Sequence, residues 1–328
     1  MTNRSGRLSR RRAIEAALAV PLSWAGFAAH AQDKPPLRLL VGFPPGGNVD
    51  YAARLLAERL RAPLGRSVIV ENKPGAGSRI ALAEIKRSAA DGSTLIVSVD
   101  AAFTIYPHTV AKLEYDAQKD FTPIVRIATY DYAIAVAASH PAANIREFMA
   151  WAERHPKEAS YASPGSGSGP SFVGQELARI FKVPLTDVPY RGGQAANTDL
   201  VGGTIAAAVG VLPDMLELHR SGKLRVLAVG GSRRNALVPE VPTLREQGVD
   251  FEGDITIGVY APRGLPPAQT LALGRTISEQ LAGADMKSAL DRQGLTPAPL
   301  SGEQLAVLHA AELRKWDALI RATGYVPQ

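Results

Sequence analysis

The chain of 328 residues contains no cysteine, which excludes disulfides, thiolate metal sites and cysteine nucleophiles. It also lacks the Gly-Lys-Ser/Thr phosphate loop of nucleotide-binding proteins. The Gly/Ser-rich segment at 165–169 has Gly167 at its centre, so it is not the serine-centred nucleophile elbow of hydrolases. No recognisable nucleophile and base pair is present, and we therefore predict that the protein is not an enzyme.

Signals for bound cofactors are missing as well. The glycine-rich turn at 75–80 has Ile80 where a dinucleotide-binding fingerprint needs its third glycine. The histidines are scattered, without the paired spacing that metal-binding helices show. No repeat of fixed period indicates a solenoid. We therefore predict no cofactor and no metal.

The first 31 residues differ in character from the rest. Five arginines precede a short apolar run at 16–22, and Ala29-His30-Ala31 fits a signal-peptidase site before Gln32. The apolar run is too short to span a bilayer. This order predicts a cleaved signal peptide at 1–31 and a periplasmic protein. The run Ser9-Arg10-Arg11-Arg12 also approximates the twin-arginine export pattern, and the sequence leaves the two export routes open.

The predicted leader accounts for most of the positive charge. Its five arginines and one glutamate give +4 of the formal net charge of +6, so the remaining residues have about +2. They contain no block of basic residues that would indicate a nucleic acid or an acidic membrane as a partner. We predict a monomer.

From Leu37 the sequence alternates short apolar runs with longer helical patterns, which indicates βαβ units and mostly parallel sheets. Strands are predicted at 37–42, 68–70, 94–99, 159–162, 187–188, 204–209 and 224–229. Helices are predicted from a cap at Asn48 and at 78–89, 145–153, 171–181, 194–200, 266–282, 284–292 and 301–323.

Two further segments predict connections between two halves of the molecule. The stretch 123–138 has no strong breaker, and 255–261 offers a second crossing. The fold class is therefore α/β with two lobes, each a mostly parallel sheet flanked by helices. We place the first lobe at 34–128 and 251–328 and the second lobe at 129–250.

Three glycine-rich turns follow predicted strands and precede predicted helices, at 43–48, 74–78 and 163–170. Glycine lets the backbone approach a ligand closely, and the free N–H groups at a helix start attract negative charge. Such turns are also ordinary connections in any α/β protein. Because two of them belong to different predicted lobes, we predict that they clamp one anion between them.

Two side-chain groups near these turns have both structural and functional interpretations. Asp50 lies in the first turn of a predicted helix, where it can stabilise the helix, shape the loop or meet a ligand. Tyr190 and Arg191 follow a predicted strand, and the guanidinium could bind a carboxylate, although a solvated arginine is commoner.

At these same residues the sequence resembles the Bug family, the solute-binding receptors of tripartite tricarboxylate transporters. The resemblance covers nearly all of the chain after the leader. Its ordered matches are Phe43 to Asp50 with Ala53-Arg54, Val70 to Gly77, Asp91-Gly92, Tyr115-Asp116, Asp120 to Pro123, Tyr161 to Ser163, Val188 to Gly192, Gly222 to Arg225, Val241 to Thr243, Glu246 to Gly248 and Lys315-Trp316.

The resemblance implies a two-lobed, Venus-flytrap periplasmic-binding-protein fold that binds a small organic carboxylate through backbone amides and hydroxyls. Its membrane partner would be a tripartite tricarboxylate-type transporter. Carried over by position, the implied ligand-binding residues are Pro45, Gly46, Gly47, Asp50, Asp100, Ala101, Ser163, Gly165, Ser166 and Tyr190. The family often has His-Leu at Ser171-Phe172 and an aspartate at Gly210, so ligand preference can differ here.

One rival function has the same fold and leader: a sensor that presents its ligand to a membrane histidine kinase. The residues alone do not separate it from a transport receptor. They also leave the identity of the carboxylate open.

Overall fold

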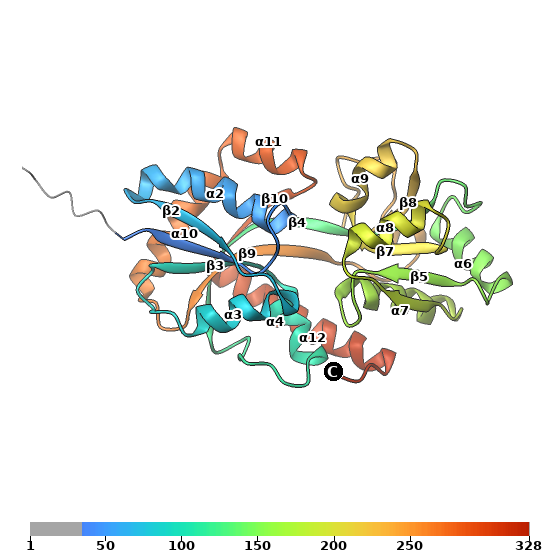
Figure 1. The fold of residues 1–328 in the computed structure, drawn as a ribbon, viewed down its shortest axis with the longest axis horizontal. Coiled ribbons are helices and arrows are strands. Elements are labelled where there is room, and N and C mark those ends of the chain that lie inside the picture. Colours follow the sequence, from blue (N-terminus) through green and yellow to red (C-terminus); the bar gives the residue numbers. More distant parts are fainter. Residues whose placement is uncertain (1–34, 328) are drawn as a thin grey trace, which may run out of the picture. The chain divides into compact units, whose positions relative to one another are not determined.

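The computed structural model describes residues 35–327, in which ten strands form a continuous mixed sheet with helices packed against it (Figure 1). The main strand order is β2-β1-β3-β9-β4-β7-β5-β6, and β8 and β10 each pair with β4. The predicted signal peptide lies outside the described residues. Within the described part, a search for helices with the length and apolar character of a membrane span found none.

The strands fall into two groups joined through β4, which we call sheet A and sheet B. Sheet A contains β1 (Leu37–Val41), β2 (Val68–Asn72), β3 (Thr94–Val99), β9 (Asp254–Pro262), β10 (Thr296–Ser301) and the first part of β4 (Phe121–Ala137). Sheet B contains the second part of β4 with β5 (Ser160–Ser163), β6 (Thr186–Pro189), β7 (Ala207–Val211) and β8 (Leu224–Val229).

Each group has a parallel part of three strands. In sheet A, β1 pairs in parallel with β2 and β3, and in sheet B, β5 pairs in parallel with β6 and β7. The strands β4, β9, β10 and β8 add antiparallel pairs around these cores. Both sheets are therefore mixed, and not mostly parallel as predicted, because β4 pairs antiparallel with each of its neighbours. The carboxyl ends of the parallel strands are therefore available in both groups, which is where open α/β sheets bind ligands.

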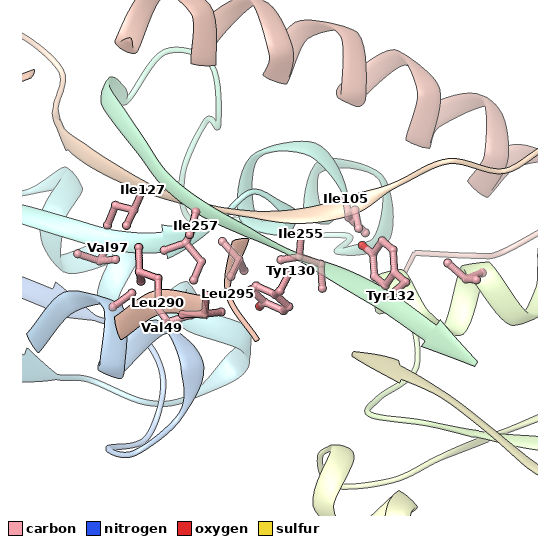
Figure 2. Close-up of a cluster of buried hydrophobic side chains, with 14 of the residues drawn as sticks. Val49, Val97, Ile105, Ile127, Tyr130, Tyr132, Ile255, Ile257, Leu290 and Leu295 are labelled. Atoms are coloured by element: carbon pink, nitrogen blue, oxygen red, sulfur yellow. The ribbon is translucent and has the colours of Figure 1, made fainter. Parts of the chain in front are cut away.

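The predicted crossing segments are two antiparallel strands. Residues of β4 from Phe121 to Asp131 pair with β9, whereas residues from Tyr132 onward pair with β7 and β8, so β4 connects the two sheets. The strand β9 pairs only with β3 and β4, within sheet A. Figure 2 shows Ile127 and Tyr130 of β4 beside Ile255 and Ile257 of β9, with Leu290 nearby. These side chains are almost fully buried, so the crossing strands are part of the hydrophobic core.

The helices connect the strands much as the alternating pattern predicted. They are α2 (Asn48–Leu64), α3 (Arg79–Lys86), α4 (Ala101–Thr104), α5 (Tyr106–Thr109), α6 (Ile145–Arg154), α7 (Gly169–Phe181), α8 (Gly193–Val201), α9 (Leu212–Arg220), α10 (Pro267–Leu281), α11 (Ala284–Arg292) and α12 (Gly302–Thr323), with 3₁₀ turns η1 (Ala76–Ser78) and η2 (Arg245–Gln247).

Several elements differ from the sequence prediction. Asn48 is not the cap of α2: Gly47 occupies the N-cap position with extended backbone, and Asn48 is the first helical residue. The short elements α4, α5, α9 and β10 were not predicted at all. For β10 the reason is its sequence, Thr-Pro-Ala-Pro-Leu-Ser, because two prolines in six residues argue against a strand. The prolines are accommodated because β10 pairs only with β4 and its register is interrupted between Pro297 and Leu300.

The last helix belongs to both groups. Near its start, His309 stacks on Phe103, which precedes β4 in the chain and belongs to the core around sheet A. Further along, Trp316 is buried against Tyr132 and Phe172. Just beyond the helix end, Tyr325 packs edge-on against Phe172 of α7. The C-terminal segment is thus placed against the start of α7.

Candidate functional site

The β1–α2 loop, residues 42–47, presents mainly backbone. Pro45, Gly46 and Gly47 are exposed, and Gly46 has a φ of +87°, a conformation that favours glycine. The loop ends at the first turn of α2, whose leading N–H groups have no partners within the helix. This part of the chain therefore offers donors without offering a charged side chain.

Asp50 fixes the conformation of that loop. The side chain is 2% exposed, and its two oxygens accept from the Gly46 amide (2.9 Å), Arg54 Nε (2.9 Å) and Asn72 Nδ2 (2.8 Å). Burial alone would raise the pKa of Asp50, but these three hydrogen bonds outweigh it and hold the pKa below the usual range. Asn72 also donates to the Phe43 carbonyl at 3.1 Å, so β2 braces both ends of the loop.

The β5–α7 loop, residues 164–168, is the matching segment on sheet B. Ser163 is buried, and its hydroxyl lies 3.5 Å from the Gly165 carbonyl. Ser166 is exposed, and Gly165 and Gly167 both have positive φ. Ser168 caps α7, because its hydroxyl accepts from the Ser171 amide at 3.3 Å.

Tyr190 lies beside this loop at the end of β6. Its amide donates to the Ser163 carbonyl at 2.8 Å, and its hydroxyl donates to Asp199 Oδ2 of α8 at 2.8 Å. The phenol is therefore held against α8. Arg191 is exposed, and α8 begins two residues later at Gly193.

Asp100 and Ala101 follow β3 and contact β9. The Asp100 amide donates to the Thr256 carbonyl at 3.0 Å, and its side chain is 6% exposed. Burial raises the pKa of Asp100 well above the usual range, and the negative charges of Asp254 and Glu312 raise it further. Asp100 and Ala101 thus lie at the carboxyl end of β3, beside β9.

A residue that the sequence reasoning missed lies beside the starts of α2 and α8. Asp214, in the first turn of α9, lies close to the side chain of Asn48, which follows the β1–α2 loop. A Cβ placed on Gly193 would lie 2.6 Å from Asp214 Oδ2, so this carboxylate also contacts the start of α8. Burial raises the pKa of Asp214, and the nearby Asn48 amide opposes that shift.

The same carboxylate borders a small cavity, which we call the Asp214 cavity. It is lined by Pro164, Gly193, Ala196, Asn197, Ala208, Val209, Gly210, Val211, Asp214 and Met215. Among these residues are the first residue of the β5–α7 loop and the starts of α8 and α9. None of its lining residues is basic, so positive potential there comes from helix starts and backbone amides.

The sequence did contain a signal for Asp214. Pro213 followed by an acidic residue, with Leu212, Met215 and Leu216 at helical spacing, is typical of a helix start after a strand. The structure thus places Asn48, the neighbour of Gly47, close to α9. It also places Pro164, the neighbour of Ser163, in the lining of the Asp214 cavity. None of the ten predicted ligand-binding residues lines that cavity itself. A larger cavity, bordered by Arg263, Leu271 and Arg275, contains none of the predicted site residues.

The fold matches that of known binding proteins. The structure of the periplasmic binding protein BugD superimposes with a TM-score of 0.78 and 27% identity, covering 89% of this chain and 99% of that one. The R. palustris protein Rpa4515, solved with adipate, gives a TM-score of 0.82 and 28% identity over 89% of this chain and 98% of that one. The predicted fold class is confirmed: this is a two-lobed solute-binding protein, not an enzyme.

The sequence comparisons give the family. The profile of the TctC family, the tripartite tricarboxylate transporter family receptor, matches residues 52–325. BugT of Bordetella pertussis is 31% identical over 311 residues, which cover 94% of each chain. The chain therefore belongs to the TctC family of receptors, and the resemblance to Bug proteins is confirmed.

Proposed function

We propose that the protein is a periplasmic receptor that captures a small organic carboxylate between the β1–α2 and β5–α7 loops and delivers it to a tripartite tricarboxylate-type transporter. The observation that best supports this is the position of Asp214, which lies close to Asn48 at the start of α2 and lines the cavity beside the β5–α7 loop. In this proposal the helix starts next to the two sheets face one small region.

In this proposal the backbone holds the carboxylate. Pro45, Gly46, Gly47, Gly165 and Ser166 are the groups closest to the bound anion, and Ser163, Asp100, Ala101 and Tyr190 border them. Asp50 acts by positioning, because both of its oxygens already accept hydrogen bonds from the protein. Rpa4515, a similar protein, is known with adipate, which is a carboxylate of the expected kind.

Capture requires the two halves to close on the ligand. We infer that residues 35–128 and 251–327 form one lobe and 129–250 the other, and that β4 and β9 act as the hinge. The strand β4 runs across the boundary between the two lobes, and β9 lies next to that boundary. A ligand favours the closed state only through contacts that it makes there and not in the open state.

Isothermal titration with a panel of small carboxylates tests the binding step. Gly47→Glu places a negative charge at the start of α2, where the backbone φ of −78° suits any residue. We expect Gly47→Glu to bind the carboxylate at least about tenfold more weakly than the isosteric Gly47→Gln, because the two variants share the added volume and differ only in charge. Equal loss in both variants would contradict the anion-binding role of this helix start.

Delivery needs a separate test. Cells that lack the gene for this protein should take up the ligand poorly, and uptake should return with the parent protein but not with Gly47→Glu. Normal uptake in those cells, despite tight binding in vitro, would favour the sensor function instead.

A further inference from the structure

Two side-chain oxygens at the Asp214 cavity, from Asp214 and Asn197, are acceptors, and this bears on which carboxylates the site takes. Asp214 Oδ2 lies beside Gly193, whose lack of a side chain leaves the carboxylate uncovered from that direction. Asn197 is 1% exposed and also lines the cavity. Its Oδ1 is buried and accepts no hydrogen bond from any described residue.

The orientation of the Asn197 amide follows from its neighbour. Its Nδ2 donates to the Asp214 main-chain carbonyl at 3.0 Å. Exchanging the amide nitrogen and oxygen would place two oxygens against each other, so Oδ1 is the atom left without a donor. A buried acceptor without a partner is costly, and such atoms in native proteins call for an explanation.

The size of the cavity limits what can supply the missing donor. The space beside Asp214 and Asn197 has room for little more than a water-sized group. A hydroxyl or an ammonium group fits there, whereas a second carboxylate would meet the Asp214 oxygen and be repelled.

We propose that Asp214 and Asn197 form a specificity subsite that selects, among small carboxylates, those that also bear a hydroxyl or ammonium group. This inference rests on the proposed function, because it assigns the second polar group of the same ligand. The carboxylate of the ligand lies on the helix starts, and its donor group lies on the two acceptors. Asn48 lies close to Asp214 on the side of the β1–α2 loop.

Matched acids that differ in one group test the subsite. Three sets suffice: propionate, lactate and alanine; succinate, malate and aspartate; glutarate, 2-hydroxyglutarate and glutamate. In any set that binds, we expect the hydroxy or amino acid to bind at least about tenfold more tightly than its unsubstituted parent acid. A preference for the amino acid alone identifies ammonium as the donor, and equal gains identify either donor.

The variants connect this preference to the subsite. Asp214→Asn retains the shape and removes the charge, so the preference should fall toward unity, and most strongly for the amino acid. Glu217→Gln, on the exposed side of the same helix, is the matched control and should leave the preference unchanged. Gly193→Ala adds a methyl group on α8, and its Cβ would lie 2.6 Å from Asp214 Oδ2. This variant should also reduce the preference.

The outcomes separate this inference from the function on which it rests. If carboxylates bind but the unsubstituted acids bind as tightly as the others, the subsite is wrong and the receptor function stands. If the preference exists and survives both Asp214→Asn and Gly193→Ala, another group confers it and the inference is wrong. If no acid of any set binds, both proposals fail.

Discussion

The two glycine loops are held in place by different forces. The β1–α2 loop is braced by a polar cluster, in which Asp50 accepts hydrogen bonds from Gly46, Arg54 and Asn72. The β5–α7 loop is braced by packing instead. A Cβ on Gly167 would lie 2.6 Å from the Tyr325 hydroxyl, and Gly169 is in equally close contact with Tyr132.

This difference has a physical consequence for how each loop can fail. A polar brace is directional and depends on the ionisation of one buried group. A packed brace depends on shape and on a residue at the far end of the chain, and it responds to added or removed volume. The role that we propose for both loops, presenting backbone to a ligand, therefore has two independent sets of supporting residues.

Removing the polar brace should have the largest effect. Asp50→Ala leaves the Gly46 amide, Arg54 and Asn72 without their acceptor, so we expect the free energy of unfolding to fall by about 2–3 kcal/mol. Carboxylate affinity should fall at least about tenfold, because the loop loses its conformation. Urea unfolding and titration calorimetry measure the two effects.

The exposed Glu58→Ala, on the same helix, is the control for that experiment. An Asp50→Ala protein with normal affinity would mean that the loop does not need its polar brace.

Filling the packed brace should have a smaller effect. Gly167→Ala adds a methyl group at a φ of +70° and against the Tyr325 hydroxyl, which should cost about 1–2 kcal/mol of stability and weaken binding severalfold. Tyr325→Phe in the same background removes the closest atom, and thermal unfolding should show partial recovery. Additive effects of the two substitutions would argue against the contact.

Asp50 and Asp214 should contribute to the pH dependence of stability with opposite signs, and these contributions should be the smallest of the expected effects. The pKa of Asp50 lies below its usual range, so its stabilising effect is present at neutral pH and is lost as the pH falls through the lowered folded-state pKa. The pKa of Asp214 is raised, so its ionisation opposes folding above the usual aspartate range.

Unfolding curves of Asp50→Asn and Asp214→Asn from about pH 3 to about pH 8 measure these effects. We expect Asp50→Asn to be less stable than the parent at neutral pH and Asp214→Asn to be as stable or more stable. Both differences should shrink toward acid pH. If both variants were less stable than the parent at neutral pH, the opposite roles of Asp50 and Asp214 would be contradicted.

Much of the fold was predictable because local patterns and tertiary structure agree. The buried strand at Leu37–Val41, the glycine turn after it and the helix that follows all have the expected periodicity, and the strands β4 and β9 were placed from uninterrupted β-type runs. The strand β10 was missed because two prolines in six residues argue against a strand. The helix α9 was missed although its start has a proline and an acidic residue, because it follows β7 directly, without a loop that separates the two patterns.

For the candidate site, the glycine-rich turns were visible but their neighbours were not. The sequence placed Asp50 in a first helical turn and left its role open, and the contacts with Asn72 and Arg54 resolve its geometry. Tyr190 was an open candidate for ligand contact, and its hydroxyl in fact donates to Asp199. Spacing predicts the pair of Asp50 and Arg54, because the two stand four residues apart on one helix. It does not predict Asn72 or Asp199 as partners, because contacts between different elements depend on packing.

By itself the sequence determined the class of molecule: an α/β chain without cysteine, with backbone-rich turns at strand ends and crossing segments between two halves. These features are local, since they depend on residue type and periodicity along the chain. Only the tertiary structure decided that Asn48, Gly193 and Asp214 meet, and that Tyr325 contacts Gly167. Such contacts join residues far apart in sequence, and they exist because the core packs in one arrangement.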